Sequence, residues 1–213
     1  MQSSAGVIET YSSKVKCFEQ QRCVRCASYL DSSQKRVFDV VFCLILLVPG
    51  SLLLFLALLW VLIVDGSPAI FCQKRTGKNG VPFTMPKVRT LKKGVHPDTP
   101  SYAYDLREFM FPLSKFLRKS RLDELPQLFS VLSGDMTLVG PRPELVPITE
   151  NYTPRQMKRL CTKPGLTGLW QIRASRQKPI HQSMQYDLYY IRNASFWLDL
   201  KILAETFFFL LKV

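Results

Sequence analysis

The chain has 213 residues, enough for one compact domain with a hydrophobic core. Its 29 basic and 16 acidic residues give a formal net charge of +13, which indicates anionic partners: phosphate-rich substrates, acidic lipid headgroups or nucleic acid. The length and the irregular spacing of the six cysteines exclude a small disulfide-stapled scaffold. A hydrophobic fraction of 47% beside so many basic residues is typical of a protein that meets a membrane.

The first 34 residues are polar and mixed, and we interpret residues 1–34 as an N-terminal extension. Cys17, Cys23 and Cys26 cluster there, and Cys23-x-x-Cys26 supplies at most half of a zinc site, because no second CxxC or CxxH follows. We therefore expect reduced thiols. No secretory signal peptide is expected, since the apolar run begins only near Val37 and no A-x-A-like site follows it.

Residues 40–64 carry no charged side chain and are long enough to cross a bilayer as a helix. In the middle of this segment, Pro49 removes a backbone donor and Gly50 loosens the helix, so a sharp break is expected. Basic residues on both flanks conflict with a simple crossing: Lys35, Arg36, Lys74, Arg75 and Lys78. We expect a re-entrant helix over residues 35–66 that enters and leaves on the cytoplasmic side. A kinked single span is the alternative.

The last stretch, residues 196–211, is rich in aromatic and aliphatic residues but is interrupted by Asp199, Lys201 and Glu205. It is too charged to span a membrane and suits an interfacial helix. An ordinary core helix is the alternative.

Residues 67–213 are predicted to be α+β, mainly helical with a small β-hairpin or sheet. A strand is expected to end near residues 71–73, followed by a hairpin turn at residues 77–80. A short returning strand would carry Lys87 and Arg89 on one face, because alternate residues of a strand share a face. Residues 92–101 are predicted to form a loop.

Helical spacing resumes in an apolar stripe of Leu106, Phe109, Leu113, Phe116 and Leu117. A second helix is predicted from about residue 125 to 132, ending before Gly134, with Pro126 in its first turn. Asp123 and Glu124 would then lie at or just before a helix N-terminus. Turns and short helices are expected beyond this point, with few strands.

The densest cluster of charge is residues 118–124, Arg-Lys-Ser-Arg-Leu-Asp-Glu. Taken alone it has two interpretations: a solvated helix end capped by Asp123, or a catalytic pair. In a catalytic pair, one carboxylate attacks phosphorus as a nucleophile and the other holds a divalent cation. Basic side chains would then hold the phosphate oxygens, since phosphoryl transfer depends on positioning and charge stabilisation.

A second segment, residues 134–144, has two glycines and two prolines that fix the backbone around Arg142. A rigid arginine flanked by prolines is a suitable fork for phosphate. The alternative is a structural turn whose arginine pairs with a local carboxylate.

Together these segments resemble the bacterial sugar transferases, the monotopic phosphoglycosyl transferases that start capsule, exopolysaccharide and glycoprotein glycan assembly. The resemblance runs in order from about residue 35 to residue 201. It rests on these motifs: Phe71…Gln73…Arg75…Gly77…Gly80…Phe83, Lys87…Arg89-Thr90, Arg118…Leu122-Asp123-Glu124-Leu125-Pro126-Gln127, Gly134-Asp135-Met136…Leu138-Val139-Gly140-Pro141-Arg142-Pro143-Glu144, Lys163-Pro164-Gly165-Leu166-Thr167-Gly168-Leu169-Trp170-Gln171 and Tyr186-Asp187…Tyr190…Asn193…Ser195…Asp199.

The resemblance implies that Asp123 is the nucleophile of a covalent phosphosugar intermediate and that Glu124 binds Mg2+. It implies a membrane helix broken at Pro49 and a catalytic domain over residues 67–213 with interfacial helices. The implied phosphate or substrate contacts are Lys87, Arg89, Arg118 and Arg142, with Pro143 and Glu144 shaping the pocket.

The implied donor is a UDP-sugar, the implied acceptor is undecaprenyl phosphate, and UMP is released. The enzyme would lie among the lipids of the bacterial inner membrane with its catalytic domain on the cytoplasmic face, and a homo-oligomer is compatible with the sequence.

Proteins of two other classes share some of these features. A basic nucleic-acid-binding protein with a membrane anchor would use the positive charge for phosphate contacts, but no helix-turn-helix, zinc finger or stacking-aromatic module is recognisable, so we expect no nucleic acid partner. A non-catalytic membrane scaffold would tolerate the loss of Asp123. The sequence does not identify the sugar or the glycan pathway.

Overall fold

The structure is a computed structural model that describes residues 28–93, 106–174, 180 and 183–211. A short 3-10 helix, η1 (Ser28–Asp31), leads into the long helix α2 (Ser33–Asp65). The Ser32 side chain caps α2 by accepting a hydrogen bond from the backbone of Lys35 at 3.1 Å. Among the described helices, α2 is the one long and apolar enough to cross a membrane. The expectations for residues 1–27, with their three cysteines, and for 94–101 lie outside the described residues.

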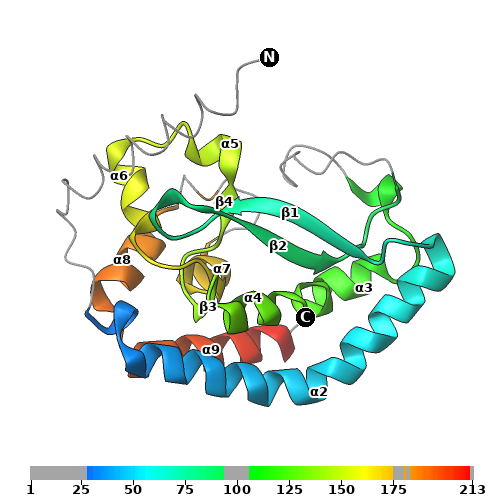
Figure 1. The fold of residues 1–213 in the computed structure, drawn as a ribbon, viewed down its shortest axis with the longest axis horizontal. Helices are drawn as coiled ribbons and strands as arrows, with labels where there is room; N and C mark the ends of the chain where they lie inside the picture. Colours follow the sequence, from blue (N-terminus) through cyan, green and yellow to red (C-terminus); the bar gives the residue numbers. More distant parts are fainter. Residues whose placement is uncertain (1–27, 94–105, 175–179, 181–182, 212–213) are drawn as a thin grey trace.

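Helix α2 is continuous through Pro49, so the expected break into separate helices is not found. Figure 1 shows instead that α2 runs along the bottom of the view and then turns upward, a change of direction for which an internal proline is an ordinary cause. The neighbouring Gly50 is buried, and a Cβ atom there would stand 3.4 Å from the side chain of Leu125. The middle of α2 therefore lies close to the residue that follows Glu124.

The predicted hairpin is confirmed. Strands β1 (Ile70–Thr76) and β2 (Pro82–Val88) pair antiparallel through the turn η2 (Lys78–Gly80). Asn79 has a φ of 55° in this turn, a left-handed conformation that asparagine tolerates better than most residues. A two-residue strand, β4 (Glu144–Leu145), pairs with the other edge of β1 and brings a distant segment to the hairpin.

The apolar stripe that begins at Leu106 does not form one helix. It is divided between η3 (Leu106–Phe109) and the short helix α3 (Ser114–Lys119). Pro112 has no backbone N–H to donate to a helical hydrogen bond, and Leu113 has a φ of 69°. The chain therefore turns sharply between η3 and α3. Helical spacing alone missed this turn.

The helix expected after the acidic pair is confirmed as α4 (Gln127–Ser133), with Pro126 at its N-cap position. Asp123 and Glu124 lie just before it, in the 3-10 turn η4 (Leu122–Glu124). Gly134 ends α4 with a φ of 93°, the left-handed conformation that glycine adopts without strain.

Two strands of three residues were not expected from the sequence. Strand β3 (Thr137–Val139) pairs in parallel with β5 (Gly165–Thr167). The pairing depends on glycine, because a Cβ atom on Gly165 would stand 2.1 Å from the backbone nitrogen of Gly140. This close approach fixes the start of the segment that carries Arg142.

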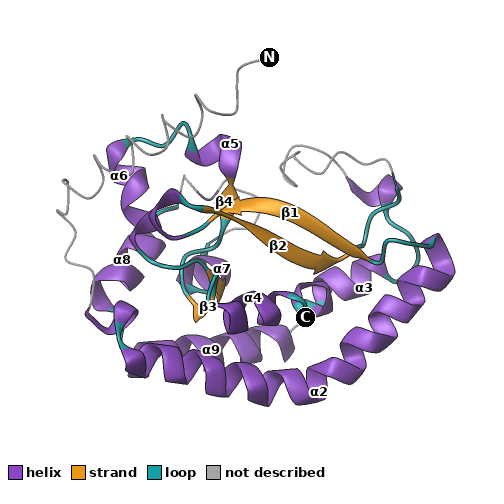
Figure 2. Cartoon of the chain, in the orientation of Figure 1, coloured by secondary structure: helices purple, strands orange, loops and turns teal. Residues whose placement is uncertain are grey.

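The remaining described helices are short except for the last: α5 (Val146–Thr149), α6 (Pro154–Met157), η5 (Lys158–Cys161), α7 (Leu169–Arg173), α8 (Gln185–Asn193) and α9 (Phe196–Leu211). Figures 1 and 2 show α9 lying next to the first half of α2, below the β1–β2 hairpin. Its Asp199 and Ile202 are fully buried, whereas Trp197, Phe207 and Phe208 are at least 60% exposed. Helix α9 thus has a core face, as the core-helix alternative expects, and an exposed aromatic face; its interfacial role stays a prediction.

Two groups of buried residues hold these layers together. The larger joins α2, β2, α4, β3, α8 and α9 through residues that include Cys43, Met85, Leu128, Leu138 and Ile202. The smaller joins the second half of α2 to Val88, Phe111 and Leu117. The turn that carries Asp123 and Glu124 lies against both α2 and β2.

Candidate active site

Asp123 and Glu124 are adjacent carboxylates, each only 8% exposed, in the turn between α3 and α4. The turn begins at Arg121, whose φ of 63° is unusual for a residue other than glycine and lets the chain reverse direction within one residue. Two carboxylates are costly to bury unless cations or hydrogen bonds compensate them. The surroundings of the two side chains differ in this respect.

Three cationic side chains converge on a single oxygen of Glu124, Oε1. Lys87 lies 3.1 Å from it, Arg121 3.2 Å and Arg142 3.5 Å. Burial raises the pKa of Glu124, but the charges of Lys87, Arg142 and Arg121 outweigh burial and hold that pKa well below its usual range. Glu124 is therefore a fixed negative charge that gathers cations from three segments far apart in the sequence.

The carboxylate of Asp123 is less compensated. Its Oδ1 atom is buried and has no hydrogen-bond partner among the described residues. Burial and the neighbouring charge of Glu124 raise the pKa of Asp123 to about 6, against the opposing charges of Lys87, Arg121 and Arg118. A desolvated carboxylate without hydrogen bonds is a stronger nucleophile than a solvated one, and perturbed carboxyls of this kind are typical of functional sites.

Lys87 and Arg118 were both predicted to contact substrate, and the structure brings both toward the acidic pair. Lys87 reaches Glu124 from β2, near the end of the hairpin. Arg118 is at the C-terminal end of α3, where its Nε donates to the hydroxyl of Thr90 at 2.8 Å. That bond uses one of its five N–H donors and orients the guanidinium.

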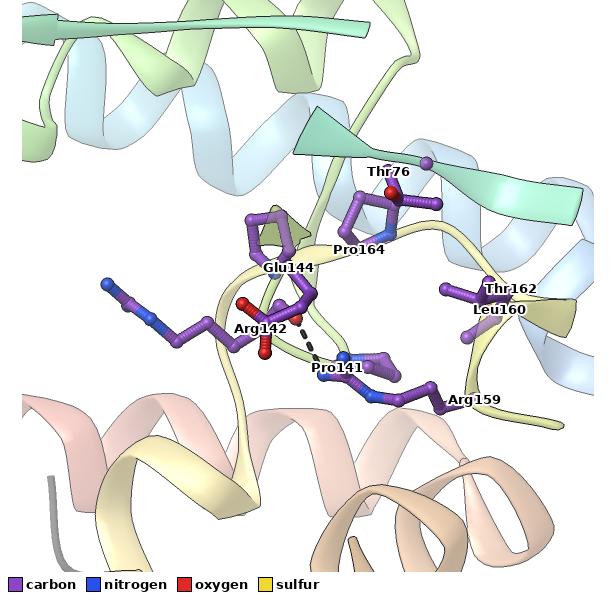
Figure 3. Close-up of a pocket in the computed structure, with 10 residues that line it drawn as sticks. Thr76, Pro141, Arg142, Glu144, Arg159, Leu160, Thr162 and Pro164 are labelled. Atoms are coloured by element: carbon purple, nitrogen blue, oxygen red, sulfur yellow. Dashed lines mark hydrogen bonds between the residues drawn. The ribbon is translucent and has the colours of Figure 1, made fainter. Parts of the chain in front are cut away.

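Arg142 comes to the site from the segment between β3 and β4. Figure 3 shows its side chain extending away from Arg159, whose guanidinium is bonded to the Arg142 backbone carbonyl. The next residues, Pro143 and Glu144, pass beside β1, where Arg75 donates to the Pro143 carbonyl at 3.4 Å. Glu144 is 5% exposed and accepts a hydrogen bond from the backbone of Leu145.

Glu144 and Pro143 line a pocket behind this segment, together with Thr76, Gly77, Pro141, Arg142, Arg159, Leu160, Thr162 and Pro164. Its volume of about 10 Å³ has room for about one water molecule. The pocket is too small for a sugar or a nucleotide.

The structure does not bring Arg89 to the acidic pair. Its guanidinium pairs with Asp65 and donates to the carbonyls of Pro68 and Gly66, each at 2.6 Å. It also reaches the carbonyls of Asp65 and Leu91. Arg89 follows the end of β2 and is occupied at the C-terminus of α2, where free carbonyl groups favour a cation. Lys87 and Arg89 therefore have different partners, although they were expected on one face.

Three residues in or behind the site had no role predicted from the sequence: Arg121, Arg159 and Asp187. Arg121 stands within the charged cluster but was not given a role, and its contact with Glu124 depends on a backbone turn that the sequence does not reveal. Arg159 and Asp187 form a fully buried ion pair at 2.8 Å, from segments 28 residues apart. Asp187 did appear in a family motif, and that was the available signal.

The carboxylate oxygens of the acidic pair are suitable ligands for a magnesium ion that is bound together with a substrate. Among the described residues no group of three or more His, Cys, Asp or Glu side chains is placed to hold a metal. Mg2+ is commonly bound through one or two carboxylates plus substrate phosphates. Asp123 and Glu124 are two adjacent carboxylates, and the unpartnered Oδ1 of Asp123 shows that the described residues do not fully compensate the pair. The fit therefore requires a phosphate-bearing substrate.

Comparison with known proteins places these residues in a family. Residues 30–213 match the family described as bacterial sugar transferase, which is most of the chain. The chain belongs to the bacterial sugar transferase family. This confirms the resemblance drawn from the motifs and the enzyme class, phosphoglycosyl transferase.

Several curated members of the bacterial sugar transferase family are similar to this chain. An uncharacterized sugar transferase, EpsL, of Bacillus subtilis is 38% identical over 178 residues, which are 81% of this chain and 84% of that protein. The UDP-glucose:undecaprenyl-phosphate glucose-1-phosphate transferase of Caulobacter vibrioides is 38% identical over 183 residues, 81% of this chain and 68% of that protein. The undecaprenyl-phosphate galactose phosphotransferase of Salmonella typhimurium is 36% identical over 188 residues, which are 81% of this chain but only 39% of that protein. The match thus spans most of some relatives and well under half of others.

Proposed function

We propose that this chain transfers a sugar-1-phosphate from a UDP-sugar to undecaprenyl phosphate, releasing UMP. The observation that carries the proposal is the asymmetry of the acidic pair: Glu124 is surrounded by three cations, whereas Asp123 has a buried oxygen without a partner. The named activities of the Caulobacter vibrioides and Salmonella typhimurium relatives support the same class of reaction.

The reaction proceeds in two displacements at phosphorus. In the first, a carboxylate oxygen of Asp123 attacks the phosphorus that bears the sugar, a P–O bond to Asp123 forms, and the bond to the bridging oxygen breaks so that UMP leaves. In the second, an oxygen of the lipid phosphate attacks the same phosphorus, and the bond to Asp123 breaks. The products are the polyprenyl diphosphate sugar and free Asp123.

The cations around Glu124 stabilise the negative charge that accumulates on the phosphate oxygens. Lys87 and Arg142 each have a side chain that is only partly buried, with exposed fractions of 19% and 25%, so both can turn toward a bound diphosphate. Arg118 is held beside them by Thr90. Glu124 would hold Mg2+, which would supply further neutralisation of the diphosphate charge.

We further propose that the reaction takes place at the cytoplasmic face of the bacterial inner membrane, with α2 as a re-entrant segment. Residues along the outer side of α2 are largely exposed and apolar, among them Val48, Leu52, Phe55 and Ile63. A membrane location lets a water-soluble donor meet a lipid-linked acceptor at one site. The pathway would be the first membrane step of capsule, exopolysaccharide or glycoprotein glycan synthesis.

The test is UMP release by purified protein with Mg2+, undecaprenyl phosphate and a panel of UDP-sugars. Wild type is expected to release UMP with at least one donor, and Asp123→Asn is expected to release none, because its amide is not a nucleophile. The matched control is Asp31→Asn, an exposed aspartate that pairs with Lys78 and should keep wild-type activity. Absence of release by wild type across the whole panel would overturn the proposed function.

A further inference from the structure

Arg159 lies in η5 and contacts neither carboxylate of the acidic pair, yet its guanidinium is more completely enclosed than any cation of the site described above. Its side chain is 1% exposed, compared with 25% for Arg142 and 19% for Lys87. Burying an arginine this deeply is costly unless its charge and its donors are satisfied. The partners of Arg159 therefore indicate what the residue is for.

The guanidinium of Arg159 joins three separate segments. Its Nε and Nη2 donate to Asp187 of α8 at 3.0 and 2.8 Å, and its Nη1 donates to the hydroxyl of Tyr152 at 2.9 Å. Its shortest bond, at 2.6 Å, runs from Nη2 to the backbone carbonyl of Arg142. The planar fork of arginine reaches all three partners at once, which a lysine ammonium on a flexible stem cannot do in the same geometry.

The bond to the Arg142 carbonyl acts on a backbone that has little other freedom. Pro141 and Pro143 flank Arg142, and each proline fixes its own φ near one value. With the carbonyl also held, the direction in which the Arg142 side chain leaves the backbone is set. Figure 3 shows that this direction is away from Arg159, and the Arg142 guanidinium ends 3.5 Å from Glu124.

We infer that Arg159, held by Asp187 and Tyr152, is a positioning residue that aims Arg142 at the acidic pair and at a bound diphosphate. The inference rests on the proposed function for its kinetic consequence, but the contact on which it depends is independent of that function. The adjoining pocket is small, with room for only about one water beside the contact.

The test is a double-mutant cycle on kcat and KM for the UDP-sugar. Arg159→Lys is expected to lower kcat/KM by about 10- to 100-fold, since a displacement of a catalytic group by about 1 Å costs roughly this much. In an Arg142→Gln background the same change is expected to cost less than about threefold, because Arg159 acts through Arg142. Effects that multiply in the double variant would overturn the inference, as would full activity of Arg159→Lys.

Arg36→Lys is the matched control. Arg36 also donates two bonds of 2.6 Å to backbone carbonyls, those of Val131 and Leu132, but it contacts no residue of the site. If Arg36→Lys lowers kcat/KM, it should lower it by the same factor in the Arg142→Gln background, because Arg36 does not act through Arg142. Tyr152→Phe removes one partner of Arg159 and keeps the ion pair, so it serves if Arg159→Lys does not fold. Tyr152→Phe is expected to lower kcat/KM by about three- to tenfold, and this loss should also vanish in the Arg142→Gln background.

Hydrogen exchange of the backbone over residues 137–145 gives a readout that does not need activity. Faster exchange there in Arg159→Lys, without the same change in Arg36→Lys, is expected. If wild type released no UMP while this exchange still increased, the proposed function would fail and the positioning by Arg159 would stand. Unchanged exchange would overturn the positioning whatever the activity.

Discussion

Asp123 and Glu124 are neighbours in the chain with the same exposed fraction, and what distinguishes them is the position of nearby cations. Three cations contact Glu124 within 3.5 Å, and no described residue donates to Oδ1 of Asp123. A carboxylate fixed by several cations is a weaker nucleophile than one without hydrogen bonds, because its charge is already delocalised into those contacts. This difference supports the proposal that Asp123 attacks phosphorus and that Glu124 keeps its negative charge in place.

Lys87→Met is expected to lower kcat by about 100- to 1,000-fold, the usual loss when one donor that stabilises a developing negative charge is removed. The folded state should survive, since Arg121 and Arg142 still compensate Glu124. The measurement is UMP release at saturating donor.

The control for Lys87→Met is Lys74→Met, because Lys74 lies on the other strand of the same hairpin with an exposed side chain. It should keep wild-type activity. Equal losses in the two variants would show that only the overall positive charge of the hairpin matters, and the specific role of Lys87 would be wrong.

At the scale of the elements, a buried network of charged and phenolic side chains joins α2 to α8 and α9. Lys35 of α2 lies 2.6 Å from Asp199 of α9 and 2.9 Å from Asp39. Asp199 also accepts bonds from Tyr190 of α8 and from Tyr29. The aspartate that interrupts the apolar last stretch of the sequence is therefore an anchor between helices.

Lys35→Met would leave Asp39 and Asp199 buried without their cation. Breaking a buried ion pair by removing one partner costs about 3–5 kcal/mol of the free energy of unfolding. For a chain of this size that corresponds to a fall in Tm of about 6–20 °C. The measurement is thermal unfolding in detergent, with Arg173→Met as control.

The control removes an ion pair with Glu205 in which the arginine side chain is 52% exposed, so it should cost no more than about 1 kcal/mol. A similar fall in Tm for both variants would contradict the role given to the buried network.

The hairpin, the helix after Glu124 and the place of the acidic pair could be predicted from the sequence, because each depends on local signals: paired glycines, a proline in a first turn, alternating residues. Residue contacts between distant segments could not. The convergence of Lys87, Arg121 and Arg142 on Glu124 depends on backbone turns at Arg121 and between β3 and β4. No periodic pattern of apolar residues marks these turns, so the sequence did not predict them. For the same reason the sequence did not reveal the partners of Arg89 at the end of α2, which are set by tertiary structure.

At the scale of the whole molecule, the proposed membrane location concerns α2 and α9. Both have apolar outer faces, and they lie side by side in Figures 1 and 2. The bend in α2 is compatible with a re-entrant segment and also with a kinked span, because the helix itself is not interrupted. The two arrangements predict different sides of the membrane for the C-terminal end of α2.

The re-entrant arrangement predicts that both ends of α2 are cytoplasmic. Cys72 in β1 is exposed and reports the end that follows α2, and Gln34→Cys reports the end that precedes the apolar segment. In a protein whose other cysteines are serine, an impermeant thiol reagent should label both positions from the cytoplasmic side. Glu150→Cys, at an exposed position of the soluble part, marks that side. Labelling of position 34 and Cys72 from opposite sides would establish a span instead.

The most direct test of the central claim is the intact mass of the protein after incubation with its UDP-sugar and Mg2+ but without lipid acceptor. Wild type and Asp31→Asn are expected to gain the mass of one sugar phosphate, and Asp123→Asn is expected to gain none. Addition of undecaprenyl phosphate should return wild type to its original mass. An adduct that persists in Asp123→Asn would contradict the assignment of Asp123 as the nucleophile.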